Sequence, residues 1–186
     1  MVMDLKSILI WLLRIPYCRG FGIHSPTDYG FVRYVVNEHY PYYGYDDLYE
    51  QLPYLSRRKR KLSELYFRIA NWKQPEKVLL LSRDFEVYKS YVTRGCNKSI
   101  ADNKCLEGIY DLIIIGKDSS IVVFDNIAKS LNDGSVLVVE SICDENRTLW
   151  NRLIKWDRAT ICYDLYYAGI VIFDEKREKR QYKINF

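Results

Sequence analysis

The sequence predicts an α/β protein with a mostly parallel β-sheet that is covered by helices on both faces. Three short apolar runs, at 78–81, 111–116 and 135–140, have the length and continuity of strands buried on both sides. Segments with helical periodicity separate these runs, and such alternation is typical of a parallel sheet. Two further strands that lie close together, at 160–166 and 169–173, predict an antiparallel hairpin near the C-terminus.

The first part of the chain is predicted to be helical. An apolar segment at 7–13 is too short to span a bilayer. We expect it to form a helix that docks on the domain, with attachment to a membrane surface as the alternative. Ser25, followed by a proline, is typical of a helix start, and this helix is expected to end near Tyr40. An irregular, tyrosine-rich segment at 41–54 then leads to a second helix over 62–70.

The remaining elements alternate to the end of the sequence. Three more helices are expected at 84–92, 121–131 and 148–156, and a last strand is expected at 182–186. We therefore expect an N-terminal helical cap at 1–75 and an α/β domain at 76–186, which together form one compact unit.

Composition and charge narrow the classes of function. The 186 residues carry a net charge of +4, which is lower than is typical of nucleic-acid-binding proteins. The densest basic run is Arg57, Arg58, Lys59, Arg60 and Lys61. We expect it to be the solvated start of a helix, and a patch for an acidic partner is the alternative. Five widely spaced cysteines and two histidines predict reduced thiols in a cytoplasmic protein without a zinc site.

Several segments resemble a known family. The segments 19–26 (RGFGIHSP), 66–75 (YFRIANWKQP), 162–173 and 181–186 (QYKINF) are similar to parts of a Bacteroidetes group of methyltransferase-like proteins. The order of strands and helices likewise resembles the class I S-adenosylmethionine-dependent methyltransferases, whose sheet ends in an antiparallel hairpin. The resemblance implies a Rossmann-like methyltransferase sheet with S-adenosylmethionine as the cofactor.

The loop after the first strand departs from this family. The resemblance implies a cofactor loop of the form E/D-x-G-x-x-x-G, in which glycines let the backbone approach the cofactor. Here the strand runs into Ser82 and Asp84, and no glycine follows before Gly95. We expect the side chains of Arg83, Phe85 and Val87 to fill the space of the cofactor's amino-acid part and ribose. Ser82 and Asp84 are nevertheless the candidate cofactor-binding residues of this loop.

The other strand ends depart from the family as well. The span between the first two apolar runs has room for one helix and one short strand, so the sheet is expected to be truncated by one or more strands. Asp102, after that short strand, is either a remnant of the family's ribose-binding acid or a loop aspartate. Gly116 is a further cofactor-binding candidate, and Glu140 and Asp164 are the catalytic candidates. A single retained acid cannot hold a divalent ion, so no metal is expected.

These departures predict a methyltransferase-like protein with lost or weakened cofactor binding and no methyl-transfer activity, so that no cofactor is expected. The first alternative is an active methyltransferase, for a small molecule or a macromolecule, that binds S-adenosylmethionine through an atypical loop. The second alternative is a protein that binds an acidic partner through Arg57–Lys61. A protein partner or a homo-oligomer is expected in preference to a nucleic acid or a membrane surface.

Overall fold

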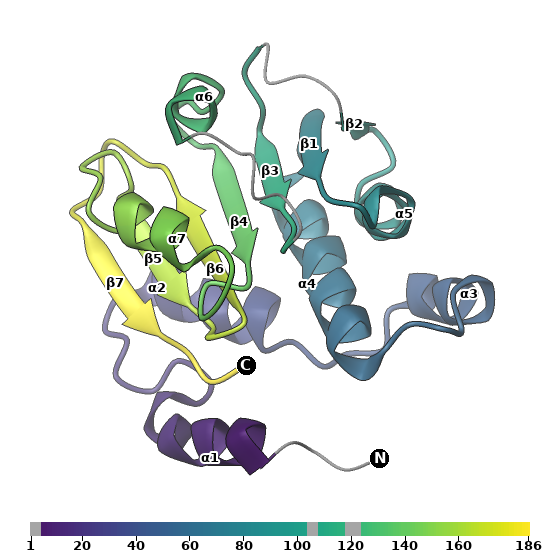
Figure 1. The fold of residues 1–186 in the computed structure, drawn as a ribbon, viewed down its shortest axis with the longest axis horizontal. Coiled ribbons are helices and arrows are strands. Elements are labelled where there is room, and N and C mark those ends of the chain that lie inside the picture. Colours follow the sequence, from purple (N-terminus) through teal and green to yellow (C-terminus); the bar gives the residue numbers. More distant parts are fainter. Residues whose placement is uncertain (1–4, 104–107, 118–123) are drawn as a thin grey trace.

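A seven-stranded sheet forms the centre of the protein (Figure 1). The computed structural model describes residues 5–103, 108–117 and 124–186. The strand order is β2-β1-β3-β4-β6-β5-β7. The strands are β1 (Lys77–Leu81), β2 (Ile100–Asp102), β3 (Leu112–Ile115), β4 (Val136–Glu140), β5 (Ile161–Asp164), β6 (Ala168–Ile172) and β7 (Arg180–Lys183).

Six of these seven described strands run in the same direction. β1 pairs in parallel with β2 and β3, β3 pairs in parallel with β4, and β5 pairs in parallel with β7. β6 is antiparallel to both of its neighbours, β4 and β5. The predicted fold, a mostly parallel sheet with an antiparallel C-terminal hairpin, is confirmed. Between β1 and β3 the described residues form one helix and one short strand, as expected for a truncated sheet.

The helices were found in most of the places where periodicity predicts them. In chain order they are α1 (Leu5–Leu13), the 3-10 helix η1 (Ile15–Tyr17), α2 (Pro26–Phe31), the π-helix η2 (Val32–Val36), α3 (Tyr43–Gln51), α4 (Arg57–Lys73), α5 (Phe85–Gly95), α6 (Phe124–Lys129) and α7 (Arg147–Leu153). The predicted helix over 121–131 begins outside the described residues, and α6 is its described part.

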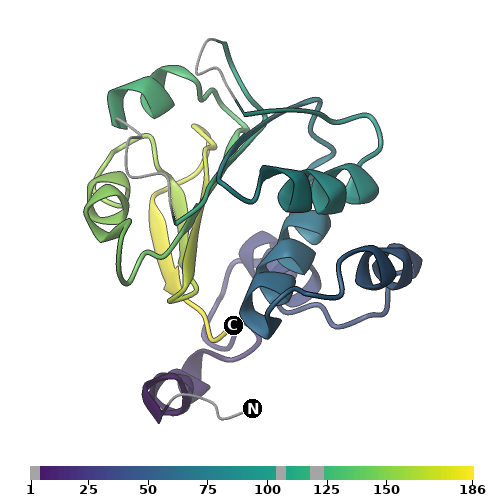
Figure 2. The same ribbon diagram turned by 45° about the vertical axis from the view of Figure 1, so that its right-hand side comes forward.

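The helices cover both faces of the sheet, which gives three layers (Figure 2). Side chains alternate along each strand, so Leu80 and Ile114 face one core while Leu79 and Ile113 face the other. Helices α2 to α5, with η2, bury their apolar side chains in the first core, and α6 and α7 do so in the second. The first core joins side chains from the predicted cap to side chains of the sheet.

Two expectations for the N-terminal region are wrong. The tyrosine-rich segment 41–54 is not irregular throughout, because it contains α3, which buries Tyr45 and Leu48 one helical turn apart. The helix that begins after Ser25 ends at Val36 and not near Tyr40. These differences arise because tertiary packing, which local patterns do not report, decides where marginal helices begin and end.

Two buried polar side chains join the helices to each other and to the sheet. Asp28 on α2 is 1% exposed and accepts hydrogen bonds from Arg177, Tyr182 and Tyr163. Arg68 on α4 is 5% exposed and donates to the backbone carbonyls at the end of η2. Both groups have their hydrogen-bonding needs met, which is the usual condition for burying charge.

Candidate functional site

The carboxyl ends of four neighbouring strands bring most of the predicted site residues to one edge of the sheet. Ser82 follows β1 and Gly116 follows β3, while Asp102 and Glu140 are the last residues of β2 and β4. Because these strands pair in parallel, their carboxyl ends lie along the same edge. Ligands of open α/β sheets bind at this edge. The arrangement therefore places the candidates where a small-molecule site is expected.

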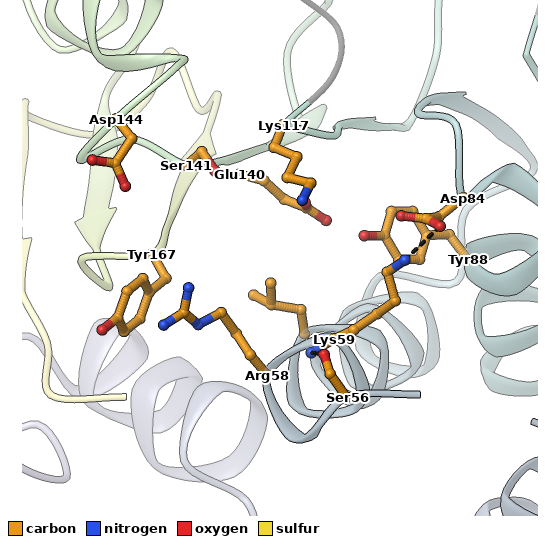
Figure 3. Close-up of a pocket in the computed structure, with 11 residues that line it drawn as sticks. Ser56, Arg58, Lys59, Asp84, Tyr88, Lys117, Glu140, Ser141, Asp144 and Tyr167 are labelled. Carbon is orange, nitrogen blue, oxygen red and sulfur yellow. Dashed lines mark hydrogen bonds and ion pairs between the residues drawn. The ribbon is translucent and has the colours of Figure 1, made fainter. Parts of the chain in front are cut away.

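A cavity of about 460 Å³ lies between this edge and the first turn of α4 (Figure 3). Its volume falls within the range of small-molecule sites. The lining includes three cations and three acids, but only one aliphatic side chain. The lining residues are Ser56, Arg58, Lys59, Leu62, Asp84, Tyr88, Lys117, Glu140, Ser141, Asp144 and Tyr167.

Side chains of the loop after β1 and of α4 hold this loop in place. Ser82 Oγ accepts a hydrogen bond from the backbone N–H of Asp84 at 3.1 Å. The Asp84 carboxylate forms an ion pair with Lys59 Nζ at 2.5 Å, and Lys59 reaches it from the first turn of α4 (Figure 3). Arg83 is exposed and Phe85 packs against the core. Val87 is buried in the same core. The contacts that hold this loop therefore come from Ser82, Asp84 and Lys59.

A buried carboxyl, Glu140, forms one wall of the cavity. Its Oε1 accepts a hydrogen bond from the Tyr66 hydroxyl at 2.5 Å, and Tyr88 also donates to it. Burial raises the pKa of Glu140, while the donors from Tyr66, Tyr88 and the backbone of Lys117 oppose that rise. Burial and the nearby Glu140 raise the pKa of both tyrosines, which keeps their hydroxyls protonated. A carboxyl with a raised pKa can serve as a general acid or base.

Replacing Tyr66 with phenylalanine is expected to lower the free energy of unfolding by about 2 kcal/mol at neutral pH, because the buried Glu140 carboxylate loses its shortest donor. The pKa of Glu140 then rises further above its unfolded value. A carboxyl whose pKa is raised loses stability as the pH increases through the unfolded pKa, so the loss is smaller below about pH 4.

Urea unfolding at both pH values tests this prediction. Tyr54→Phe is the matched control, because Tyr54 is 72% exposed and its replacement is expected to leave stability unchanged. An equal loss for Tyr66→Phe at the two pH values would contradict the coupling to Glu140.

Gly116 and Asn146 hold the strand ends together. A Cβ at Gly116 would lie 2.5 Å from Ser82 Oγ, so only glycine permits this close approach of the segments that follow β1 and β3. Asn146 Nδ2 donates to the carbonyl oxygens of Gly116 at 3.1 Å and Glu140 at 2.9 Å. Ser141, directly after β4, has a φ of +52°, which is uncommon for a non-glycine residue. Gly116 thus has a packing role that accounts for it without a cofactor.

Among the candidate cofactor-binding and catalytic residues, only Asp84 and Glu140 line the cavity. Asp164, at the end of β5, forms an ion pair with Arg14 at 2.9 Å and accepts a hydrogen bond from the Tyr166 N–H at 2.8 Å. Asp102 is exposed at the end of the edge strand β2 and accepts a hydrogen bond from the Asn103 N–H. The structure therefore separates both carboxylates from Glu140 and Asp84.

The basic run at the start of α4 is divided among different surroundings. Arg58 and Lys59 line the cavity. Arg60 and Lys61 lie over the rings of Tyr49 and Phe186, outside the cavity, and Arg57 is exposed. The five cations do not form one continuous patch, because consecutive residues on a helix point in different directions around its axis.

Several residues that line the cavity or contact Glu140 were not among the candidates from the sequence. Tyr66 and Tyr88 occupy apolar helix positions that are indistinguishable from core positions, and no local pattern indicates that they meet Glu140. Lys117 and Ser141 each stand next to a residue at a strand end. The rule that ligands bind at carboxyl ends of strands could have found these two.

The described part of the chain contains four cysteines and no cluster of metal ligands. No group of three or more His, Cys, Asp or Glu side chains there could hold a metal ion. Cys18, Cys96 and Cys162 are free thiols, Cys143 Sγ donates a hydrogen bond to Asp144 at 3.1 Å, and Cys105 lies outside the described residues.

Solved structures of other proteins have a similar fold. No protein-family model matches the chain, and no curated protein matches its sequence. The structure of the methyltransferase PaMTH1 from Podospora anserina, bound to S-adenosylhomocysteine, is similar over 82% of this chain and 97% of its own, with a TM-score of 0.52 and 10% identity. A methyltransferase from Geobacter sulfurreducens is similar over 74% of this chain and 93% of its own, with a TM-score of 0.51 and 8% identity. The chain has a methyltransferase-like fold. At such low identity the likeness concerns the fold alone.

Proposed function

We propose that this protein has lost or weakened S-adenosylmethionine binding, carries out no methyl transfer, and acts as a binding protein. The observation that supports the proposal is the closed loop after β1. Its residues Ser82–Asp84 include no glycine, and the ion pair from Lys59 ties Asp84 to α4. A nucleoside cofactor at the end of β1 would have to displace this loop.

Packing makes such a displacement costly. The side chain of Ser82 already lies against Gly116, so the loop has no room to move toward β3. The Lys59–Asp84 pair is partly exposed, and it contributes about 1 kcal/mol or less by itself. The barrier therefore comes mainly from the side chains and the backbone path of the loop, and the ion pair adds to it.

The residues that line the cavity are also too polar for a typical adenosine site. Sites for flat, apolar groups are lined mostly by hydrophobic side chains. Here Leu62 is the single aliphatic side chain in a lining that holds three cations and three acids. Such a surface fits a small polar or zwitterionic molecule, or the charged side chains of a partner protein.

Titration of the intact chain with S-adenosylmethionine, followed by calorimetry, tests the proposal. We expect no saturable heat, which corresponds to a Kd weaker than about 1 mM. A known S-adenosylmethionine-binding methyltransferase, titrated under the same conditions, is the positive control. Saturable binding with a Kd of about 10 μM would overturn the proposal.

The alternative is an active methyltransferase with an atypical cofactor loop, and two observations favour it. Asp102 stands at the carboxyl end of β2, where the resemblance places a ribose-binding acid, and the buried carboxyl of Glu140 borders a cavity of suitable size. This alternative predicts micromolar cofactor binding that Asp102→Asn weakens. The same calorimetric titration therefore distinguishes the two functions.

A further inference from the structure

Helix α1 presents an apolar surface that is largely exposed. Leu9, Trp11 and Leu13 are 56%, 51% and 68% exposed, and Leu12 is 48% exposed. At 3.6 residues per turn these side chains spread over more than half of the helix circumference. Phe21, after the helix, is 80% exposed. The segment forms the expected helix, but these apolar side chains are not buried against the domain.

Polar contacts join α1 to the rest of the protein. Asn185 Nδ2 donates to the carbonyl oxygen of Trp11 at 3.3 Å. Arg14, directly after the helix, donates to the carbonyl oxygen of Ile184 at 3.1 Å and pairs with Asp164. The helix thus projects at one end of the molecule, beside the C-terminus (Figures 1 and 2). Its apolar face remains available for another surface.

Three basic side chains are linked to this helix through contacts or through their position in the chain. Lys61 Nζ lies 4.2 Å from the centroid of the Phe186 ring, and the neighbouring Asn185 contacts α1. Arg57 precedes Lys61 by four residues and so shares its face of α4. Arg19 follows the end of α1 by six residues. Arg57, Lys61 and Arg19 are exposed, and within the described part of the chain none of them forms an ion pair.

We infer that α1, flanked by Arg57, Lys61 and Arg19, binds the surface of an anionic lipid bilayer. An exposed apolar helix that carries tryptophan and leucine side chains, next to basic residues, is the typical composition of an interfacial anchor. None of the described helices is long and apolar enough to cross a membrane. With nine residues, α1 has the length of a helix that lies along the surface. This inference concerns a different surface from the cavity and is independent of the proposed function.

The charges argue against a second copy of the chain as the occupant. A two-fold dimer brings the same surface of both copies together. Such a dimer would cover the apolar side chains of α1, but it would give Arg57, Lys61 and Arg19 no anionic partner. Anionic headgroups, in contrast, complement the cations while the acyl region accepts the apolar side chains.

Co-sedimentation of the intact chain with vesicles tests the inference. We expect binding to phosphatidylcholine vesicles that contain phosphatidylserine and much weaker binding to phosphatidylcholine alone. Leu9→Asp combined with Leu13→Asp is expected to abolish binding. Arg57→Gln combined with Lys61→Gln is expected to lower the partition coefficient by about fivefold for each cation removed.

The matched control is Lys98→Gln combined with Lys129→Gln. These exposed lysines belong to the loop before β2 and to α6, at the end of the molecule opposite α1 (Figure 1). Their loss removes the same charge, and we expect binding to change by less than about twofold. Failure to bind the anionic vesicles, or equal losses in the two charge variants, would overturn the inference. So would a dimer that Leu9→Asp with Leu13→Asp converts to monomer without any vesicle binding.

Discussion

Replacing Asp28 with asparagine is expected to lower the free energy of unfolding by about 3 kcal/mol at neutral pH. The Asp28 carboxylate accepts hydrogen bonds from Arg177 at 2.6 Å, Tyr182 at 2.8 Å and Tyr163 at 3.1 Å. These bonds connect α2 to β5, to β7 and to the loop before β7. Asparagine keeps the size of the side chain but removes the charge, so Arg177 loses its ion-pair partner in a partly buried site.

The contribution of Asp28 to stability depends on pH, because the surrounding side chains lower its pKa. Burial acts to raise the pKa of Asp28, but the hydrogen bonds from Arg177, Tyr182 and Ser25 together hold the pKa below its ordinary value. A carboxyl with a lowered pKa contributes stability above its unfolded pKa and loses it as the pH falls through the folded pKa. The difference between wild type and Asp28→Asn should therefore shrink below about pH 4.

Urea unfolding across this pH range measures the effect, with Asp157→Asn as the matched control. Asp157 is exposed, so its replacement is expected to change stability by less than about 0.5 kcal/mol. If Asp28→Asn were as stable as wild type at neutral pH, the buried network would have no stabilising role.

Replacing Arg68 with methionine is expected to cost about 3 kcal/mol of stability, because it leaves three buried acceptors without a donor. Arg68 donates to the carbonyl oxygens of Val35 at 2.7 Å and Val36 at 3.2 Å, and to the Tyr45 hydroxyl at 3.2 Å. The carbonyls at the end of a helix carry partial negative charge, which a buried guanidinium complements. One side chain thus joins α4 to η2 and α3.

The variant Arg68→Lys distinguishes the contribution of the positive charge from that of the planar arrangement of donors. Lysine keeps the charge but lacks the planar set of donors, so we expect about half of the loss. Arg83→Met is the control for a removed arginine, because Arg83 is exposed, and its stability is expected to match wild type. Guanidinium chloride unfolding of the three variants tests the prediction. A loss for Arg68→Met no larger than for Arg83→Met would contradict it.

The sheet could be predicted from the sequence because each strand carries its own signal. β3 and β4 are apolar at almost every position, which is typical of strands that are covered on both faces. Helix α3 could not be predicted in the same way. Its tyrosines pack against Phe67 and against each other, and only the folded protein brings these rings together.

Only the part of the candidate site that lies at the strand ends could be predicted from the sequence. Ser82, Gly116 and Glu140 stand at strand ends, so the topology of a parallel sheet is enough to bring them together. The start of α4 comes from a distant part of the sequence, and no local pattern places Arg58 and Lys59 opposite those strand ends. The strand ends that border the cavity could therefore be predicted from the sequence, whereas the wall formed by the basic run could not.

Crystals of the intact chain grown with excess S-adenosylhomocysteine test the central claim most directly. The account predicts an intact Lys59–Asp84 ion pair and no nucleoside at the carboxyl ends of β1 and β3. A bound nucleoside whose ribose hydroxyls contact Asp102, with the Ser82–Asp84 loop displaced to admit it, would contradict the account.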